Sequence, residues 1–279
     1  YSKLLDCDIM RLDAYLAETR PEYSRSAWQK LIKHGNVCVN GACIDSGKYD
    51  VSEEDDITVK LPDEPTQTIE FLVLYEDDDV TVINKPVGIL THAKGTFSEE
   101  FTIADFVKPK TTYKADTNRP GIIHRLDRAT SGVLLCVKNE AAATMLSKQF
   151  ERRTAKKTYY AITDGVPAQM KATIDVPIGR NPKAPSTFRA DPNGKSAQTY
   201  YEVQAENGKN ALVKLQPTTG RTHQLRVHMA HIHTPIKGDA VYGKPSDRLY
   251  LHAYQLQITL PSGENHIFTA EVPSEFVLP

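Results

Sequence analysis

The segment Pro62-Asp63-Glu64-Pro65-Thr66 divides the chain into two regions that are expected to fold separately. Two prolines this close together, around acidic residues, are typical of a linker. The break predicts a small domain over residues 9–61, a linker over 62–68 and a larger domain over 69–279. With 279 residues and 40% hydrophobic content, the chain has enough apolar material for a small core beside a larger one.

The first region is predicted to contain two helices followed by a β-hairpin. Residues 11–18 show short helical spacing of leucines, and a second helix is expected over 24–33, where Ser24 is a good N-cap. The pair Asn40-Gly41 between short apolar runs indicates a tight hairpin. A last strand at 57–61 is expected to close the domain.

The second region is predicted to be an α+β domain. Its strands are expected at 71–75, 80–83, 133–137, 159–162, 200–204 and 211–216, and its longest helix at 140–150. Strands outnumber helices and follow one another closely, which favours a mixed, mainly antiparallel sheet. We expect this domain to enclose a central cleft.

Bulk properties exclude several classes of protein. No apolar run approaches the roughly 18 to 20 residues that span a bilayer, and residues 1–10 carry no apolar signal core. A soluble, cytoplasmic protein without membrane association is therefore expected. For the two-domain architecture we separately expect a monomer. The net charge of −1 does not by itself indicate a nucleic-acid-binding protein. Phosphates, however, interact with nearby cations, so a local basic patch can bind RNA whatever the total charge.

Cysteines and histidines are not expected to bind metal. The four cysteines lack CxxC spacing, and Cys38 and Cys136 alternate with apolar residues, which predicts reduced, buried thiols in preference to disulfides or metal ligands. Four histidines cluster late in the chain: His223, His228, His231 and His233. No carboxylate completes a convincing ligand set around them.

A basic stretch occurs in the first region. Its cations are Arg20, Arg25, Lys30 and Lys33, against the single acid Glu22. Such a helix face is by itself usually a solvated surface. The surrounding pattern consists of Arg11-Leu12-Asp13, Ser24-Arg25-Ser26, Leu31-Ile32 and the run from Gly35 to Gly41. It closely resembles the S4 RNA-binding module, and this resemblance implies RNA contacts by Arg11, Arg25, Lys30 and Lys33.

The most informative segment of the second region is 120–132, which places Asp127 in a loop between Arg125 and Arg128. Two neighbouring cations favour the ionised carboxylate and keep it nucleophilic at neutral pH. Taken alone, an aspartate among arginines is more often a structural ion pair. A Thr-Ser-Gly turn and a buried strand follow directly.

The string His124-Arg125-Leu126-Asp127 followed by Thr130-Ser131-Gly132 closely resembles the catalytic signature of the RluA family of pseudouridine synthases. Further family-like stretches are Asn84 to Gly88, Lys157 to Tyr159, Thr219 to His228, Gly238 to Gly243 and Leu251 to Ala253. The resemblance implies that Asp127 is the nucleophile. It also implies that Tyr159 lies against the target uracil and that Arg221 pairs with Asp127.

The same resemblance implies RNA contacts by His124 and Arg125, with Arg125 entering the RNA where a flipped nucleotide has left. Conversion of uridine to pseudouridine involves no net redox change, so no cofactor is expected. The expected partner is RNA, and the joined S4 module favours large-subunit ribosomal RNA. Transfer RNA, a dual specificity, and a non-catalytic RNA-binding protein are the alternatives.

Overall fold

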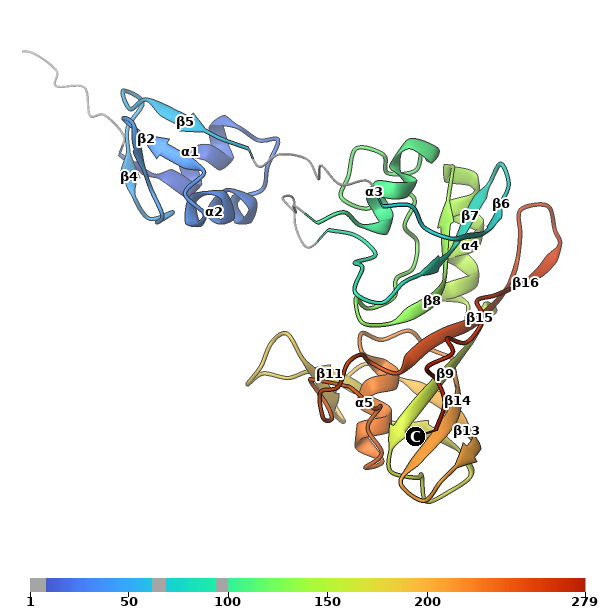
Figure 1. The fold of residues 1–279 in the computed structure, drawn as a ribbon. Helices are drawn as coiled ribbons and strands as arrows, with labels where there is room; N and C mark the ends of the chain where they lie inside the picture. The colour runs from blue at the N-terminus through green and yellow to red at the C-terminus, as the bar shows by residue number, and fades with distance from the viewer. Residues whose placement is uncertain (1–8, 62–68, 94–99, 279) are drawn as a thin grey trace, which may run out of the picture. The chain divides into compact units, whose positions relative to one another are not determined.

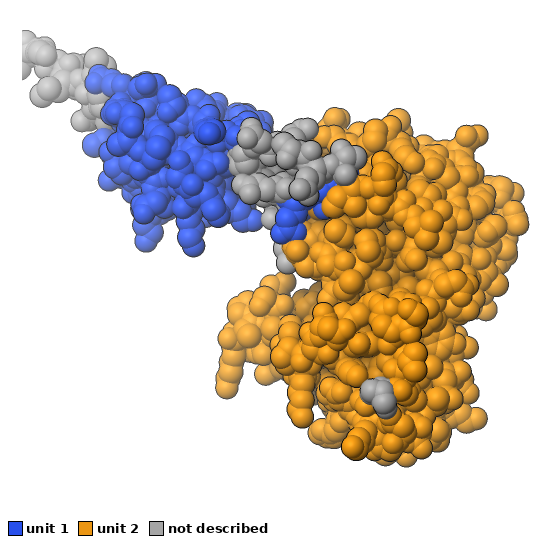
Figure 2. Space-filling view, viewed as in Figure 1, with its two compact units in different colours: residues 1–68, 93–101 blue, residues 69–92, 102–279 orange. Residues whose placement is uncertain are grey.

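The computed structural model describes residues 9–61, 69–93 and 100–278. The chain divides into two compact units, one comprising 1–68 and 93–101 and the other 69–92 and 102–279 (Figure 2). The predicted linker at 62–68 lies outside the described residues. No helix in the described ranges is long and apolar enough to cross a membrane.

The N-terminal unit packs two helices against short strands, as the sequence predicts (Figure 1). Its helices are α1 (Leu12–Thr19) and α2 (Arg25–Lys33), and its strands are β1 (Met10–Arg11), β2 (Val37–Val39), β3 (Ala42–Cys43), β4 (Asp50–Val51) and β5 (Ile57–Val59). Ser24 caps α2 by accepting the Ala27 N–H. Trp28 and Leu31 of α2 are buried beside Leu16 of α1, which fixes the two helices together.

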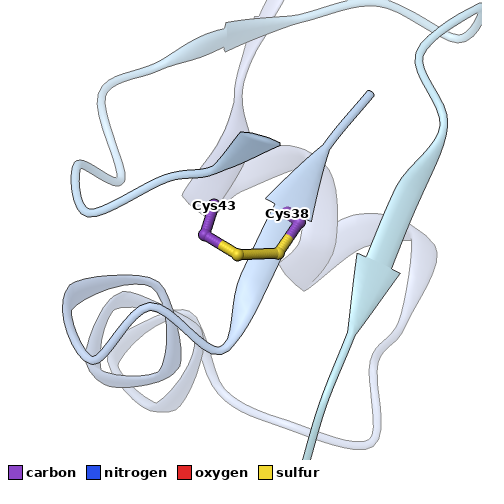
Figure 3. The surroundings of a disulfide bond; sticks show 2 residues. All are labelled: Cys38 and Cys43. Atoms are coloured by element: carbon purple, nitrogen blue, oxygen red, sulfur yellow. A yellow bond between two sulfur atoms is a disulfide. The ribbon is translucent and has the colours of Figure 1, made fainter. Parts of the chain in front are cut away.

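The prediction of reduced, buried thiols is wrong for one pair of cysteines, because Cys38 and Cys43 form a disulfide (Figure 3). The two-residue turn Asn40-Gly41 sets the register of β2 and β3, which places these residues opposite each other with Cα atoms 3.8 Å apart. Cys43 is also exposed. Cys136 is a buried free thiol, as predicted, and Cys7 lies outside the described residues.

The larger unit contains a nine-stranded sheet. Its strands are β6 (Val73–Glu76), β7 (Val80–Lys85), β8 (Ser131–Val137), β9 (Lys156–Asp164), β10 (Lys171–Asp175), β13 (Gln198–Glu206), β14 (Asn210–Pro217), β15 (Leu251–Thr259) and β16 (Asn265–Thr269). The order is β10-β13-β14-β9-β15-β8-β7-β6, and β16 pairs with β15. The predicted α+β fold with a mainly antiparallel sheet is confirmed.

The sheet's two halves meet where β15 pairs with β9 on one side and β8 on the other (Figure 1). The β15–β8 pairing is parallel and joins His252 to Ser131 and Ala253 to Gly132. Gly132 has a φ of 113°, and a Cβ there would lie 2.1 Å from the carbonyl oxygen of Ala253. Only glycine permits this close approach. The joint therefore fixes the point at which the loop carrying Asp127 enters β8.

Helices cover parts of this sheet. They are α3 (Ile103–Val107), α4 (Glu140–Glu151) and α5 (Gln224–His231), while β11 (Ile178–Arg180) and β12 (Phe188–Ala190) form a separate hairpin. Asn139 caps α4 by accepting the Ala142 N–H. Ala143 and Leu146 of α4 belong to the same buried apolar cluster as Leu135 of β8. This packing anchors both α4 and the strand that follows the Asp127 loop.

Candidate active site

A buried lysine fastens the loop that carries Asp127. Nζ of Lys85, which has no exposed surface, donates to the carbonyl oxygens of Pro86, Ile89 and Arg128 at 2.8, 2.7 and 3.2 Å. Burial lowers the pKa of Lys85 to about 7, although the charge of Asp127 opposes this shift. The bond to Arg128 ties the end of β7 to the Asp127 loop, and the other two bonds hold the segment that follows β7. The sequence motif marked Lys85 but indicated no role for it.

The three residues predicted to be catalytic meet at one cavity of about 460 Å³. Asp127 reaches it from the loop before β8, Tyr159 from β9, and Arg221 from the turn that precedes α5. These segments are far apart in the chain, and the β8–β15–β9 arrangement brings them together. Asp127 is partly exposed, so its carboxylate is accessible from this cavity.

The cation that pairs with Asp127 is Arg226, and the predicted pairing with Arg221 is wrong. Nη1 of Arg226 lies 3.5 Å from Oδ2 of Asp127. Nε of Arg221 instead donates to the carbonyl oxygen of Ser196 at 2.9 Å. The reason is local, because Arg221 precedes α5 whereas Arg226 stands in its first turn. Arg221 still lines the cavity.

Arg226 is itself held by a second carboxylate. Its Nε and Nη2 both donate to Asp239 at 2.7 Å, which is a bidentate geometry between two buried side chains. Burial opposes the charge of Arg226, but the hydrogen bonds and charge of Asp239 prevail and raise the pKa of Arg226. Asp239 also accepts the backbone N–H groups of Val241 and Tyr242. The guanidinium is thus fixed before any ligand arrives.

His223 is a second neighbour of Asp127 that sequence reasoning missed. Its Nε2 lies 3.7 Å from Oδ2 of Asp127, and its Nδ1 lies 2.8 Å from the hydroxyl of Tyr242. Burial lowers the pKa of His223, against the opposing charge of Asp127. The signal for both missed residues was present, because His223 and Arg226 lie inside the motif at 219–228.

Tyr159 presents an aromatic ring to the cavity that contains Asp127. Burial, together with the nearby charge of Asp127, raises the pKa of the Tyr159 phenol. The hydroxyl therefore stays protonated at neutral pH and can act as a hydrogen-bond donor. Lys157, two residues earlier on β9, donates to the carbonyl oxygen of Thr219, and burial lowers its pKa to about 8.

His124 and Arg125, the predicted RNA contacts beside Asp127, differ in their environments. Nε2 of His124 accepts the Leu135 N–H at 3.0 Å, and its ring stacks on Phe150. Burial lowers the pKa of His124 to about 3, so this ring is a neutral packing group in the fold. Arg125 is exposed at the rim of the cavity. Contact of either residue with RNA stays a prediction.

Two of the predicted RNA contacts in the N-terminal unit form an ion cluster. Arg11 and Arg25 both pair with Asp13, whose side chain has no exposed surface, and Gln29 also donates to it. Burial would raise the pKa of Asp13, but the hydrogen bonds from Arg25, Gln29 and Arg11 lower it to about 2. Lys30 and Lys33 are exposed on α2. The basic surface predicted from sequence is thus partly neutralised.

Among the residues that the structure describes, no group of three or more His, Cys, Asp or Glu side chains could hold a metal ion. His228 is buried, with its ring nitrogens 2.9 Å from Thr199 Oγ1 and 3.0 Å from the Val176 carbonyl oxygen. His231 and His233 are exposed. The cavity itself offers the carboxylate of Asp127, the fixed guanidinium of Arg226 and the aromatic side chain of Tyr159, which suit nucleophilic chemistry on a planar ring.

Comparison with protein families gives two matches. Residues 79–231 match the model of RNA pseudouridylate synthases, and residues 10–57 match the S4 domain. The first range includes Asp127, Tyr159, Arg221 and Arg226. The second covers the helices and hairpin of the N-terminal unit.

Individual proteins are similar over nearly the whole chain. An uncharacterized RNA pseudouridine synthase of Bacillus subtilis strain 168 is 35% identical, over 95% of this chain and 91% of that protein. Ribosomal large subunit pseudouridine synthase D of Borreliella burgdorferi is 34% identical, over 96% and 88%. The solved structure of human RNA pseudouridylate synthase domain containing 1 superposes with a TM-score of 0.62 at 27% identity, covering 77% of this chain and 87% of that one.

Proposed function

This chain belongs to the RNA pseudouridylate synthase family, and from that premise we propose that it isomerises specific uridines of large-subunit ribosomal RNA, with Asp127 as the nucleophile. The enzyme class, an isomerase that acts on RNA, follows from the family match and the similar proteins. Three further elements belong to the proposal: the identity of the RNA, the role of the carboxylate, and the flipping of the target nucleotide.

One observation carries the role of Asp127. Its carboxylate lies 3.5 Å from the buried guanidinium of Arg226 and opens on the same cavity as the ring of Tyr159. A nearby cation favours the charged form of a carboxylate, and a charged carboxylate is a nucleophile. The cavity volume of about 460 Å³ suits one nucleotide.

The reaction needs no external reagent. The N1–C1′ bond of uridine breaks, a C5–C1′ bond forms, and the proton lost from C5 is balanced by one gained at N1. Asp127 supplies the electron pair that makes departure of the base possible. The cavity must then retain the detached uracil and exclude water while the ring turns. Tyr159 supports this step because its face can stack on the base, which contributes about 1 to 3 kcal/mol.

Access to the uridine requires that the nucleotide leave the RNA stack, at a cost of a few kcal/mol. Arg125, which lines the cavity, enters the vacated position in this proposal, and stacking of the base on Tyr159 offsets part of the cost of flipping. Ribosomal large subunit pseudouridine synthase D of Borreliella burgdorferi acts, by its name, on the large ribosomal subunit. Its similarity along 96% of this chain favours that RNA as the substrate.

The decisive experiment incubates the purified full chain with unmodified large-subunit ribosomal RNA and, separately, with transfer RNA, and maps pseudouridine. We expect modification of a few positions in ribosomal RNA, and none with Asp127→Asn. Asp78→Asn is the matched control, because Asp78 is exposed and lies outside the cavity. Modification of transfer RNA alone would overturn the substrate assignment. Full activity of Asp127→Asn would overturn the nucleophile.

A further inference from the structure

A second cavity adjoins the one that contains Asp127. It has a volume of about 520 Å³ and lies between residues 113–125 and α4. The two cavities share four wall residues: Ile123, His124, Arg125 and Glu151. Because Arg125 belongs to both walls, a chain-like ligand seated in the first cavity has the second as its immediate neighbour. The proposed function gives this second cavity no task.

Cations dominate the wall of the second cavity. Lys114 and Arg119 stand on one side, Arg125 on the shared rim, and Lys148 on α4. The acids of the wall are Glu140 and Glu151. All six residues are exposed. Salt therefore screens their charges, which act on a ligand only within about a Debye length. Four positive charges against two negative ones favour an anionic ligand.

The wall that carries Lys114 and Arg119 is held in place by hydrogen bonds. Gly121 N–H donates to the Tyr113 carbonyl oxygen at 3.0 Å, which closes the segment on itself. Thr112 N–H donates to the Lys138 carbonyl oxygen at the end of β8. Tyr113 lines the cavity and lies beneath the ammonium of Lys114, 4.8 Å from Nζ to the ring centre. An aromatic ring and cations therefore occur side by side.

A buried imidazole at the back of the cavity adds a second feature. His92 lines the cavity, is only 7% exposed, and its Nδ1 has no hydrogen-bond partner among the described residues. Nε2 of His92 lies 3.5 Å from Nη1 of Arg125. The Nδ1 atom is shielded from solvent, so it does not open on the cavity. The Nε2 contact instead ties His92 to Arg125, the cation that both cavities share.

We propose that this second cavity is a nucleotide site that takes the residue flanking the target uridine in the substrate RNA. The inference rests on the proposed function. The phosphate of that nucleotide lies between Lys114 and Arg119, and its base lies against Tyr113. Arg125 separates the flanking nucleotide from the target. Beyond α4, a groove of about 780 Å³ shares Glu140, Thr144 and Lys148 with the cavity, so the RNA strand has room to continue.

The first test asks whether the cations of the second cavity contribute to RNA binding. With a ribosomal transcript that the wild-type enzyme modifies, we expect the double variant Lys114→Ala/Arg119→Ala to lower kcat/KM about tenfold or more, with kcat within about twofold. The salt dependence of log kcat/KM should lose a slope of about one to two. Glu151→Gln should have the opposite effect and raise kcat/KM. Lys209→Ala, an exposed cation outside these cavities, is the matched control and should change nothing.

The second test asks which nucleotide of the RNA lies in the second cavity. A photoreactive benzoylphenylalanine at Ser147, on the α4 wall of the cavity, should crosslink to a nucleotide next to the target uridine. The Asp127→Asn background serves here, because crosslinking requires binding and not turnover. Crosslinks only to distant nucleotides, or unchanged kcat/KM in the double variant, would overturn the nucleotide site while pseudouridine formation stood. A wild-type protein that forms no pseudouridine would instead overturn the proposed function.

Discussion

Arg226 lies 3.5 Å from Asp127 through one edge of its guanidinium and binds Asp239 through the opposite pair of nitrogens. Burial strengthens the pair with Asp239, since Arg226 is 7% exposed and Asp239 is 1% exposed, whereas Asp127 is partly exposed. Asp239 does not reach the cavity, so it acts through Arg226. The guanidinium of Arg226 thus links Asp127, the proposed nucleophile, to Asp239, which only positions Arg226.

Replacement of Arg226 by lysine should lower the rate of pseudouridine formation by about 100-fold, because an ammonium cannot pair with Asp127 and make both bonds to Asp239. Lysine keeps the charge beside buried Asp239, so the protein should still fold. Single-turnover assays with saturating RNA measure the effect. Arg221→Lys is the comparison and should lose less than about tenfold. A larger loss for Arg221→Lys would mean that the pairing changes when RNA binds.

Tyr159 is expected to contribute mainly through its ring. Tyr159→Phe retains the face that can stack on uracil and should bind substrate RNA within about twofold of the parent. Tyr159→Leu should weaken binding by about 1 to 3 kcal/mol, which corresponds to roughly 5- to 150-fold in Kd. Titrations in an Asp127→Asn background separate binding from turnover. Equal losses for both substitutions would show that the hydroxyl, and not the ring, dominates binding.

Local sequence patterns predicted most of the elements, because helices and hairpins depend on neighbouring residues. The helix at 24–33, the hairpin at Asn40-Gly41 and the buried strand at 133–137 all occur as expected. The pairing of the sheet's halves through β15 depends on contacts between residues far apart in the chain, such as Ser131 with His252 and Ala161 with Leu251. Periodicity along the chain carries no information about such pairs.

The site shows the same division. The motif strings identified Asp127 and Tyr159, which line the cavity, but they assigned the pairing with Asp127 to Arg221, whereas Arg226 makes it. That choice depends on where α5 begins, and element boundaries are the least certain part of a sequence prediction. Asp239 was equally hidden. Asp239 acts by binding Arg226, and this contact is seen only in the folded structure.

Acid should destabilise the larger unit partly through His124. Its pKa is lowered from 6.5 to about 3, mainly by burial. Between these pH values His124 is protonated in the unfolded chain but neutral in the folded protein. The free energy of unfolding therefore decreases as the pH falls from about 6.5 towards 3, by about 1.4 kcal/mol per pH unit. His124→Gln, which keeps an acceptor for the Leu135 N–H, should flatten this slope in denaturant titrations followed by circular dichroism. Exposed His231→Gln should leave the slope unchanged.

Cations of the N-terminal unit should divide into two kinds. Lys30→Ala/Lys33→Ala should weaken RNA binding and reduce the salt slope by up to about two, because both lysines are exposed on α2. Arg25→Ala should instead cost about 2 kcal/mol of stability, because it removes a charge-assisted bond to buried Asp13. Trp28 is the only tryptophan and is buried in this unit, so its fluorescence reports the loss. A loss of RNA affinity in Arg25→Ala without loss of stability would contradict this division.

The disulfide between Cys38 and Cys43 should stabilise the N-terminal unit only modestly. It bridges residues five positions apart, and closing so short a loop removes little entropy from the unfolded chain, about 2 kcal/mol. A thiol reductant should therefore lower the unfolding free energy seen by Trp28 fluorescence by about this amount. In Cys38→Ser/Cys43→Ser the reductant should have no effect, because Cys136 is a buried free thiol in the other unit. Equal sensitivity of both proteins to the reductant would place the relevant thiols elsewhere.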